Sequence, residues 1–187
     1  MERQEALNLL KEHVKSEQLY RHSLAVEAAM IAYAKHFNED EKLWGNVGLL
    51  HDVDFEKYPD EHPKMAKELL ADTSLDEDFV ETILSHGLDA KELRTNNLRK
   101  ALSAVDQMSS FILAIALLRP TGLDGLKAKS VKKKMKDKAF AKAVDREYLE
   151  QTREDLGVEF AKHVEIIVSG LKAQEERLKE EGFNLLG

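Results

Sequence analysis

Apolar residues recur along the chain at steps of three and four, which is the spacing of one buried face of an α-helix. The alternation of apolar and polar positions that marks a strand is almost missing. Five stripes predict helices: Leu7, Leu10 and Val14; Val26, Ala29, Met30, Tyr33 and Phe37; Leu43, Val47 and Leu50; Phe79, Val80, Ile83 and Leu84; and Leu98, Leu102, Val105 and Leu113. We therefore expect an all-α fold.

Polar residues and prolines suggest where some of these helices begin and end. Ser74 and Glu77 have the spacing of a capping box, and Asn97 is a candidate cap for the helix that ends near Pro120. A last long helix is predicted through Leu149, Leu156, Phe160, Val164, Ile167 and Leu171. Gly157 lies inside this stretch, where it either bends the helix or divides it in two.

Length and composition limit the class of protein. With 187 residues, 43% of them hydrophobic and 34% charged, the chain is expected to form one soluble domain over residues 1–187. It has no cysteine, which excludes disulfides and thiolate metal sites. The uncharged run Gln107–Leu118 is too short to cross a bilayer, and the first residues lack the apolar region of a secretory signal. We expect a cytoplasmic protein without membrane contact.

The charge balance is acidic, with a formal net charge of −7, and this argues against broad binding of nucleic acid. Residues 127–142 are the exception, because they hold eight lysines and one aspartate. Such a basic segment either attracts an anionic substrate to a nearby pocket or forms a solvated helix face.

Several histidines and aspartates share the apolar faces of the predicted helices. His22 lies four residues before Val26, and the pair His51–Asp52 directly follows a stripe. The others are His86, three residues after Ile83, and Asp106, four residues after Leu102; His62 lies in a loop before Pro63. Taken singly, each histidine is explained as a hydrogen-bonded core residue, and His62 as a helix cap.

Taken together, these residues predict a metal site. A buried carboxylate is costly unless a cation or hydrogen bonds compensate it, and no lysine or arginine shares the inward faces next to Asp52 or Asp106. Imidazole and carboxylate ligands suit a divalent transition metal such as Fe, Mn, Co, Ni or Zn. We therefore expect one or two such ions between the helices.

The order His22, His51–Asp52, Asp106 resembles the H…HD…D signature of the HD-domain superfamily of metal-dependent phosphohydrolases. The segments RHSLAVEAAM, GLLHDVDFEKYP, ILSHG and SAVDQMSSFI strengthen this resemblance. It implies an all-α helical bundle with a metal-binding core at about 16–120 and a helical C-terminal extension at about 121–187. His62 and His86 match two further histidines of members that bind two metals, with Asp52 as the bridging ligand. The glycine-tyrosine-proline motif of the cyclic-di-nucleotide branch is missing, so activity on cyclic dinucleotides is not expected.

The resemblance implies a hydrolase that acts on a small phosphorylated compound, such as a nucleotide, through a metal-activated water. Arg21, Asp54 and Lys57 are the candidate catalytic residues, because they lie beside the ligands in sequence. Asp54 either orients water or accepts a proton, or else it is an outer carboxylate or an exposed acid in the loop before Pro59. Glu27 is a weaker outer candidate. Two alternatives stay open: a ligand-binding or sensor module with a structural metal, and a di-iron oxygenase of the same superfamily. The sequence does not define the oligomeric state.

Overall fold

Helices make up the regular structure of residues 1–186, the part of the chain that the computed structural model describes, and none of these residues lies in a strand. The α-helices are α1 (Arg3–His13), α2 (Glu17–Phe37), α3 (Glu41–Leu50), α4 (Ala66–Leu69), α5 (Glu77–Leu84), α6 (Asn97–Leu117), α7 (Ala128–Met135), α8 (Arg146–Leu156) and α9 (Phe160–Glu180). A short 3₁₀ turn, η1 (Lys91–Leu93), precedes α6. The predicted all-α class is confirmed.

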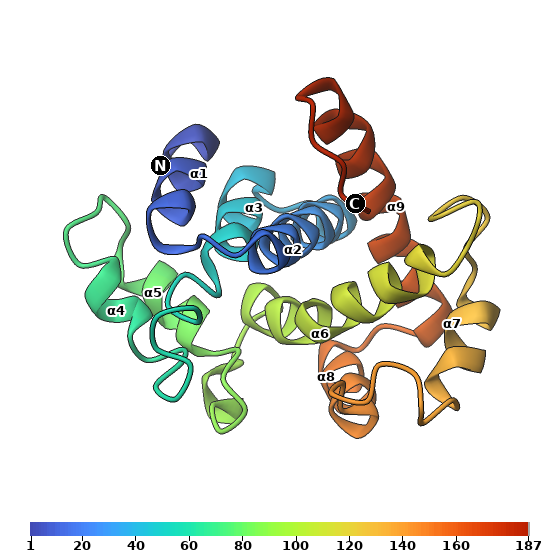
Figure 1. Cartoon of the computed structure of the whole chain (residues 1–187). Helices are drawn as coiled ribbons and strands as arrows, with labels where there is room; N and C mark the ends of the chain where they lie inside the picture. The colour runs from blue at the N-terminus through green and yellow to red at the C-terminus, as the bar shows by residue number, and fades with distance from the viewer. Residues whose placement is uncertain (187) are drawn as a thin grey trace.

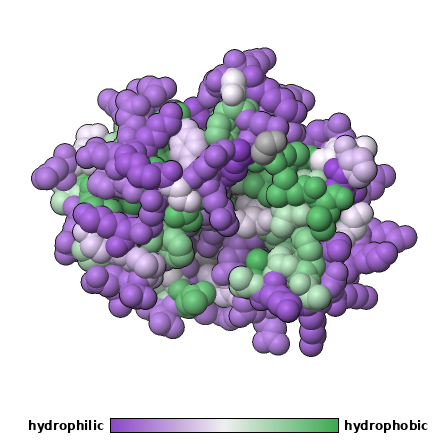
Figure 2. All heavy atoms as spheres, viewed as in Figure 1, coloured by the Kyte–Doolittle hydropathy of each residue, from purple (hydrophilic) through white to green (hydrophobic). Residues whose placement is uncertain are grey.

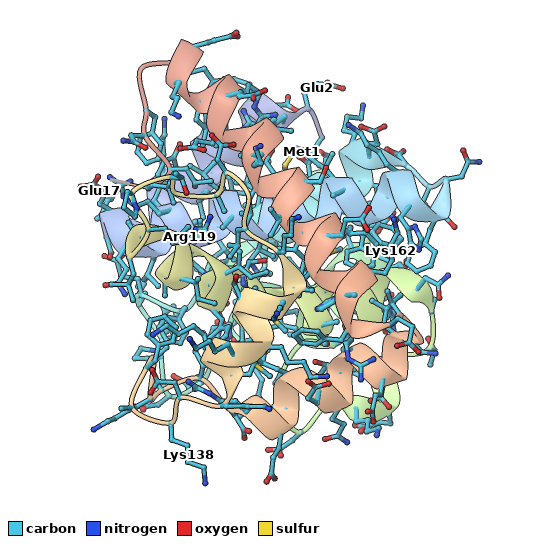
Figure 3. All side chains as sticks on the ribbon, turned by 90° about the vertical axis from the view of Figure 1, so that its right-hand side faces the viewer. Met1, Glu2, Glu17, Arg119, Lys138 and Lys162 are labelled. Atoms are coloured by element: carbon cyan, nitrogen blue, oxygen red, sulfur yellow. The ribbon has the colours of Figure 1, made fainter. Side chains whose placement is uncertain are left out.

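Two long helices organise the bundle. Helix α2 packs against α3, α6 and α9, and α6 packs against α8 on its other side. In Figure 1 the short helices α1, α4 and α5 lie on the left and α7 and α8 on the right, with α6 crossing between them. Figure 3, turned by 90°, shows α9 running diagonally across the face turned toward the viewer, in front of the blue N-terminal helices in its upper part. The C-terminal helices thus cover α2 and α6 rather than forming a separate body.

The predicted apolar stripes form one continuous core. Val26, Ala29, Met30 and Tyr33 on α2 are completely buried, as periodicity predicts. Leu43 differs, because its side chain is 41% exposed near the start of α3. The predicted burial of Leu43 is wrong, because the inward face of α3 begins with Trp44 and Val47.

The observed helix ends differ from two predicted caps and agree with one predicted division. Asp76, and not Ser74, caps α5, because its carboxylate accepts a hydrogen bond from the Phe79 amide at 2.8 Å. Asn96, one residue before the predicted cap, caps α6, because its side-chain oxygen accepts a hydrogen bond from the Arg99 amide at 3.0 Å. Gly157 divides the last predicted helix, because it caps α8 with a φ of +77°. Glycine adopts this left-handed conformation without a steric cost, so the dividing alternative is confirmed.

Helices α2 and α9 approach closely at one glycine. A Cβ atom on Gly170 would overlap the carbonyl group of Ala28 and lie 2.9 Å from the Cβ of Ala32. Small residues on both helices therefore permit the close contact that holds α9 against α2.

Glu27 belongs to a buried ion network instead of the outer shell of a metal. Its carboxylate is 1% exposed and pairs with Arg3 of α1, while α9 contributes Gln174 at 2.7 Å and Arg177 at 3.3 Å. The weaker prediction for Glu27 was wrong, because its partners lie on α1 and α9. This network ties three helices together around one buried charge.

An apolar area of the surface lies at the end of α6. Leu117 and Leu118 are 61% and 64% exposed, and green side chains gather over this end of the helix on the right of Figure 2. By length and composition alone α6 could cross a membrane, but 67% of its apolar window is buried inside the protein. A buried central helix of a bundle explains that composition.

Candidate metal centre

Five separate segments bring six ligand-type residues together. His22 comes from the second turn of α2, whose N-terminus is capped by Ser16. His51 and Asp52 follow the last turn of α3, where the helix ends and turns begin. The remaining members come from the connection after α3, from the end of α5 and from the middle of α6: His62, His86 and Asp106. We call these six residues the His/Asp cluster, and the structure brings all of them together as the sequence predicts.

Asp52 lies at the centre of this cluster. Its Oδ2 atom is 3.3 Å from the Nε2 atom of His22, while its Oδ1 atom is 3.3 Å from the Nε2 atoms of both His51 and His62. The same Oδ1 atom lies 3.4 Å from Nε2 of His86. One carboxylate therefore faces histidines on two sides.

Asp106 completes one side of the cluster. Its Oδ1 atom lies 3.2 Å from Nε2 of His22 and 3.6 Å from Nε2 of His51. A transition metal with bonds of about 2.0–2.2 Å keeps neighbouring ligand atoms about 3.0–3.5 Å apart. The spacing of these atoms is suited to an ion between them.

Each histidine is fixed through its other ring nitrogen. The Nδ1 atom of His51 donates to the Gly48 carbonyl at 2.8 Å, and the Nδ1 atom of His86 donates to the Ile83 carbonyl. Two side chains serve the other rings: the Asp54 carboxylate accepts from His62 at 2.7 Å, and the Ser110 hydroxyl lies 2.8 Å from Nδ1 of His22. All four rings consequently turn Nε2 toward Asp52. This arrangement is typical of metal-binding histidines.

The inward nitrogens require a positive charge among them. Nε2 of His22 lies 3.1 Å from Nε2 of His51, and Nε2 of His62 lies 3.0 Å from Nε2 of His86. When Nδ1 carries the proton of a neutral ring, Nε2 is an acceptor. Two acceptors that face each other beside carboxylates repel, and a cation placed among them removes the repulsion. The donor set thus fits a metal ion.

The titration properties of the cluster show the same need for positive charge, which either a proton on His22 or a metal ion can meet. Burial disfavours the charged form of His22, but hydrogen bonds and charge from Asp106 and Asp52 outweigh it and raise the pKa of His22 to about 10. Burial likewise opposes ionisation of the two aspartates, yet the surrounding imidazoles hold the pKa of Asp52 and of Asp106 well below the usual range. Both carboxylates are therefore ionised and attract a cation.

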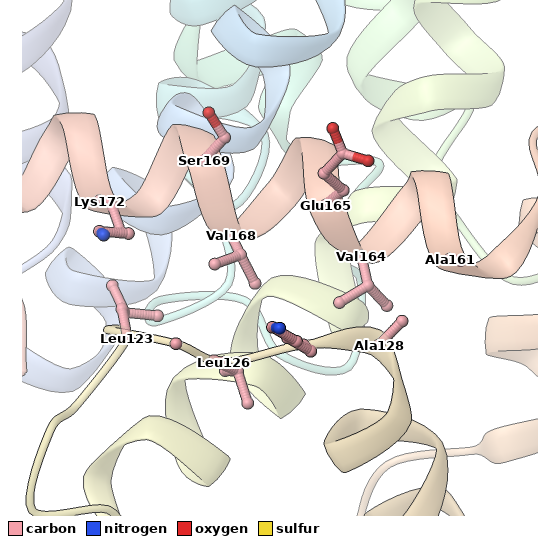
Figure 4. A pocket seen from close by; sticks show the side chains of 11 residues that line it. Leu123, Leu126, Ala128, Ala161, Val164, Glu165, Val168, Ser169 and Lys172 are labelled. Atoms are coloured by element: carbon pink, nitrogen blue, oxygen red, sulfur yellow. The ribbon is translucent and has the colours of Figure 1, made fainter.

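The cluster is open to solvent on one side. The His51 and His86 side chains are buried, whereas those of His22, Asp52, His62 and Asp106 are between 12% and 17% exposed. A groove of about 470 Å³ lies elsewhere on the surface, between α9 and the segment before α7, and is lined by residues such as Leu126 and Val168. None of the groove's lining residues in Figure 4 belongs to the His/Asp cluster.

Of the three candidate catalytic residues, only Asp54 contacts the cluster. Asp54 is completely buried behind His62, which matches its alternative as an outer carboxylate. Lys57 is exposed, and its Nζ atom lies 4.9 Å from the centre of the Tyr58 ring. Arg21 bonds to Glu17 and to the carbonyl of Asn184. Among the described residues, no contact joins Lys57 or Arg21 to the cluster.

The lysine-rich segment contributes α7, which packs against α9 and α6. Lys132 lies 5.8 Å from the centre of the Phe160 ring, and Lys134 pairs with Asp137 at 3.3 Å. Neither contact involves the His/Asp cluster, so a contact of the segment with substrate stays a prediction.

Sequence reasoning missed three residues around the ligands. Ser110 had a usable signal, because it lies one helical turn after Asp106 and so shares its face. Arg94 and Tyr148 had none, because both act on the loop of His86 from positions that are distant in sequence or in irregular structure.

The comparison with protein families agrees with the geometry. Residues 19–111 match the family model described as HD domain, and this stretch contains the whole His/Asp cluster. No match was found among curated proteins or among solved structures. The matched stretch runs from α2 into α6, so α7, α8 and α9 follow it in the chain. With its ordered ligands on these helices, the chain belongs to the HD-domain superfamily of metal-dependent hydrolases.

Proposed function

We propose that this protein is a metal-dependent phosphohydrolase with two divalent ions, which cleaves a phosphomonoester or phosphodiester of a small compound such as a nucleotide. The ions would be Fe, Mn, Co, Ni or Zn, because the ligands are imidazoles and carboxylates. We place the activity in the cytoplasm, because a chain without cysteine cannot form the disulfides that are typical of proteins in oxidising compartments.

The position of Asp52 carries the proposal. One of its oxygens faces His22, and the other lies within 3.4 Å of His51, His62 and His86, between the two groups of ligands. In this arrangement His22, His51 and Asp106 would hold the first ion, His62 and His86 would hold the second, and Asp52 would bridge them. A pair of ions about 3.5–4 Å apart is the usual arrangement for in-line displacement at phosphorus.

Divalent ions at this centre would acidify a water molecule and neutralise charge on the phosphoryl oxygens. The protein's own groups do the rest. The anchored rings keep Nε2 aimed at Asp52, and Asp54 keeps His62 in the required tautomer. The side chains of His22, Asp106 and His62 are partly exposed, and a phosphate group would reach the cluster from this side. Lys57, on the exposed loop after Asp52, is our candidate for binding a phosphate oxygen.

The test begins with protein stripped of metal by a chelator and reloaded with one metal at a time. We expect about two ions per chain, and turnover of a phosphomonoester or phosphodiester in a substrate panel. Asp52→Ala should lose both ions and at least a hundredfold in kcat/KM. Asp60→Ala is the matched control, because Asp60 is an exposed acid in the same loop.

Other outcomes separate the alternatives. Metal binding without turnover of any phosphate ester would favour a ligand-binding module. Oxygen consumption by an iron-loaded, mixed-valent centre would favour an oxygenase. An Asp52→Ala protein with its full metal content would overturn the ligand assignment.

A further inference from the structure

The loop that carries His86 begins where α5 ends. Helix α5 stops at Leu84, and the next three carbonyl groups, of Ser85, His86 and Gly87, lie beyond its regular hydrogen-bond ladder. Carbonyl groups at the end of a helix need donors from outside it. The donors found here decide where the backbone of His86 is held.

Arg94 and Tyr148 supply donors to all three carbonyl groups, beside a weaker bond from the Ser103 hydroxyl to Ser85 at 3.4 Å and one from the Ala90 amide to Gly87 at 3.1 Å. Arg94 donates from Nε to the Ser85 carbonyl at 3.0 Å and from Nη2 to the Gly87 carbonyl at 2.9 Å. Tyr148 donates its hydroxyl hydrogen to the His86 carbonyl between them, at 3.3 Å. Three consecutive carbonyl groups of the His86 loop are thus held by one arginine and one tyrosine.

Arg94 and Tyr148 also hold each other. Nη2 of Arg94 lies 3.1 Å from the Tyr148 hydroxyl, and the guanidinium lies 5.6 Å from the centre of the tyrosine ring. Arg94 is 8% exposed and lies between η1 and α6, whereas Tyr148 comes from the first turn of α8. Tyr148 is outside the stretch that matches the HD domain, so the C-terminal extension supplies this contact.

The pair acts on the metal centre through the backbone of His86. The ring of His86 is fixed to the Ile83 carbonyl, and its Nε2 lies 3.0 Å from Nε2 of His62 and 3.4 Å from Asp52. A shift of the loop would move this nitrogen away from both partners. Among the described residues, the hydrogen bonds of Arg94 and Tyr148 reach the His86 loop and neither His22 nor Asp106, so their direct support is given to the His86 side of the centre.

We propose that Arg94 and Tyr148 are positioning residues for the second metal ion, and that α8 thereby determines whether the centre holds two ions or one. This inference rests on the two-ion centre of the proposed function. Helix α8 then does more than cover α6, because it supplies the hydroxyl group that completes the support of His86.

The experiment measures metal binding, not turnover. Chelator-stripped protein is titrated with Mn²⁺ and followed by electron paramagnetic resonance, which separates isolated ions from coupled pairs. Tyr148→Phe removes only the hydroxyl and keeps the ring beside Arg94. We expect it to bind the first ion as the parent protein does and the second about 5–10-fold more weakly. Arg94→Lys loses the two-pronged contact and should weaken the second ion by more than tenfold.

Tyr33→Phe is the matched control, because Tyr33 is a buried tyrosine whose hydroxyl bonds to His163 and not to this loop. It should bind both ions with the affinity of the parent protein. Tyr148→Phe with unchanged affinity for both ions would overturn the inference, as would an equal loss at both sites. If Arg94→Lys fails to fold, Tyr148→Phe alone decides.

A parent protein that binds a single ion would also overturn this inference. Hydrolysis of a phosphate ester by that one-ion protein would leave the hydrolase proposal standing, so the two failures are distinguishable.

Discussion

Asp54 and His62 form a close pair in which the carboxylate fixes the ring. Asp54 Oδ1 accepts the Nδ1 hydrogen of His62 at 2.7 Å, and its Oδ2 accepts the backbone hydrogen of Ala66 at 3.1 Å. Both oxygens are therefore occupied, and the side chain is completely buried. Asp54 connects His62 to the start of α4 and orients it toward Asp52.

Asp54→Ala should weaken the second metal site selectively. Without the carboxylate, His62 loses its fixed orientation, and such outer partners are worth about 10–100-fold in metal affinity. We expect this loss for the second ion and little change for the first, measured by calorimetric titration of stripped protein. Asp60→Ala, in the same loop, should match the parent protein. Equal weakening of both ions would contradict the assignment of Asp54 to His62.

Adjacent serines on α6 provide a test of the first site. The Ser110 hydroxyl lies 2.8 Å from Nδ1 of His22, whereas the Ser109 hydroxyl donates to the Val105 carbonyl. Ser110→Ala should therefore weaken the first ion about tenfold, and Ser109→Ala should leave its affinity unchanged. The two variants differ by one position and remove the same atom, so an equal effect on metal affinity would rule out a special role of Ser110.

Most of the fold was predictable because periodicity reports burial directly. The α2 stripe from Val26 to Tyr33 is buried as expected, and His22, His51 and Asp106 could be placed on inward faces by counting turns. The general character of the cluster followed from charge, since carboxylates inside an apolar face need a cation.

The details that escaped prediction depend on tertiary contacts. Whether Asp76 or Ser74 capped α5 depended on which residue took an extended backbone beside the first turn. The contact of Tyr148 with His86 joins positions 62 residues apart, and no local pattern encodes it. Asp54 was ambiguous because its partner, His62, lies on an irregular loop whose path has no periodicity.

Gly170→Ala should destabilise the protein strongly. The added methyl group would overlap the backbone of Ala28, and a helix backbone cannot give way as a flexible side chain can. Overpacking of this kind costs about 1–3 kcal/mol, and we expect that decrease in the free energy of unfolding by urea. Ser169→Ala, on the preceding residue of α9, should change it by less than about 0.5 kcal/mol. A Gly170→Ala protein as stable as the parent would show that α2 and α9 do not approach as described.

His163 predicts a loss of stability in mild acid. Burial, with a further effect of the charge on Arg153, lowers the pKa of His163 to about 4, from about 6.5 in the unfolded chain. Between these two pKa values the unfolded state binds more protons than the folded state. The contribution of neutral His163 to stability is therefore present above about pH 6.5 and is lost as the pH falls toward 4. The full loss is about 3 kcal/mol.

His163→Gln provides the measurement, because glutamine does not titrate and can accept the Tyr33 hydroxyl hydrogen. Urea unfolding at pH 7 and pH 5 should show a smaller decrease in the free energy of unfolding for the variant than for the parent protein. The same decrease in both proteins would mean that His163 does not contribute to acid sensitivity.

The wide spacing of the cluster along the chain has a consequence for protein turnover. Ligands from residue 22 to residue 106 are held together only in the folded chain, so an ion bound by them stabilises the folded state alone. A free metal concentration 100 times the dissociation constant adds about 2.7 kcal/mol. Metal shortage would then raise the population of opened chains that proteases cut, and a starved cell would lose the protein itself as well as its activity.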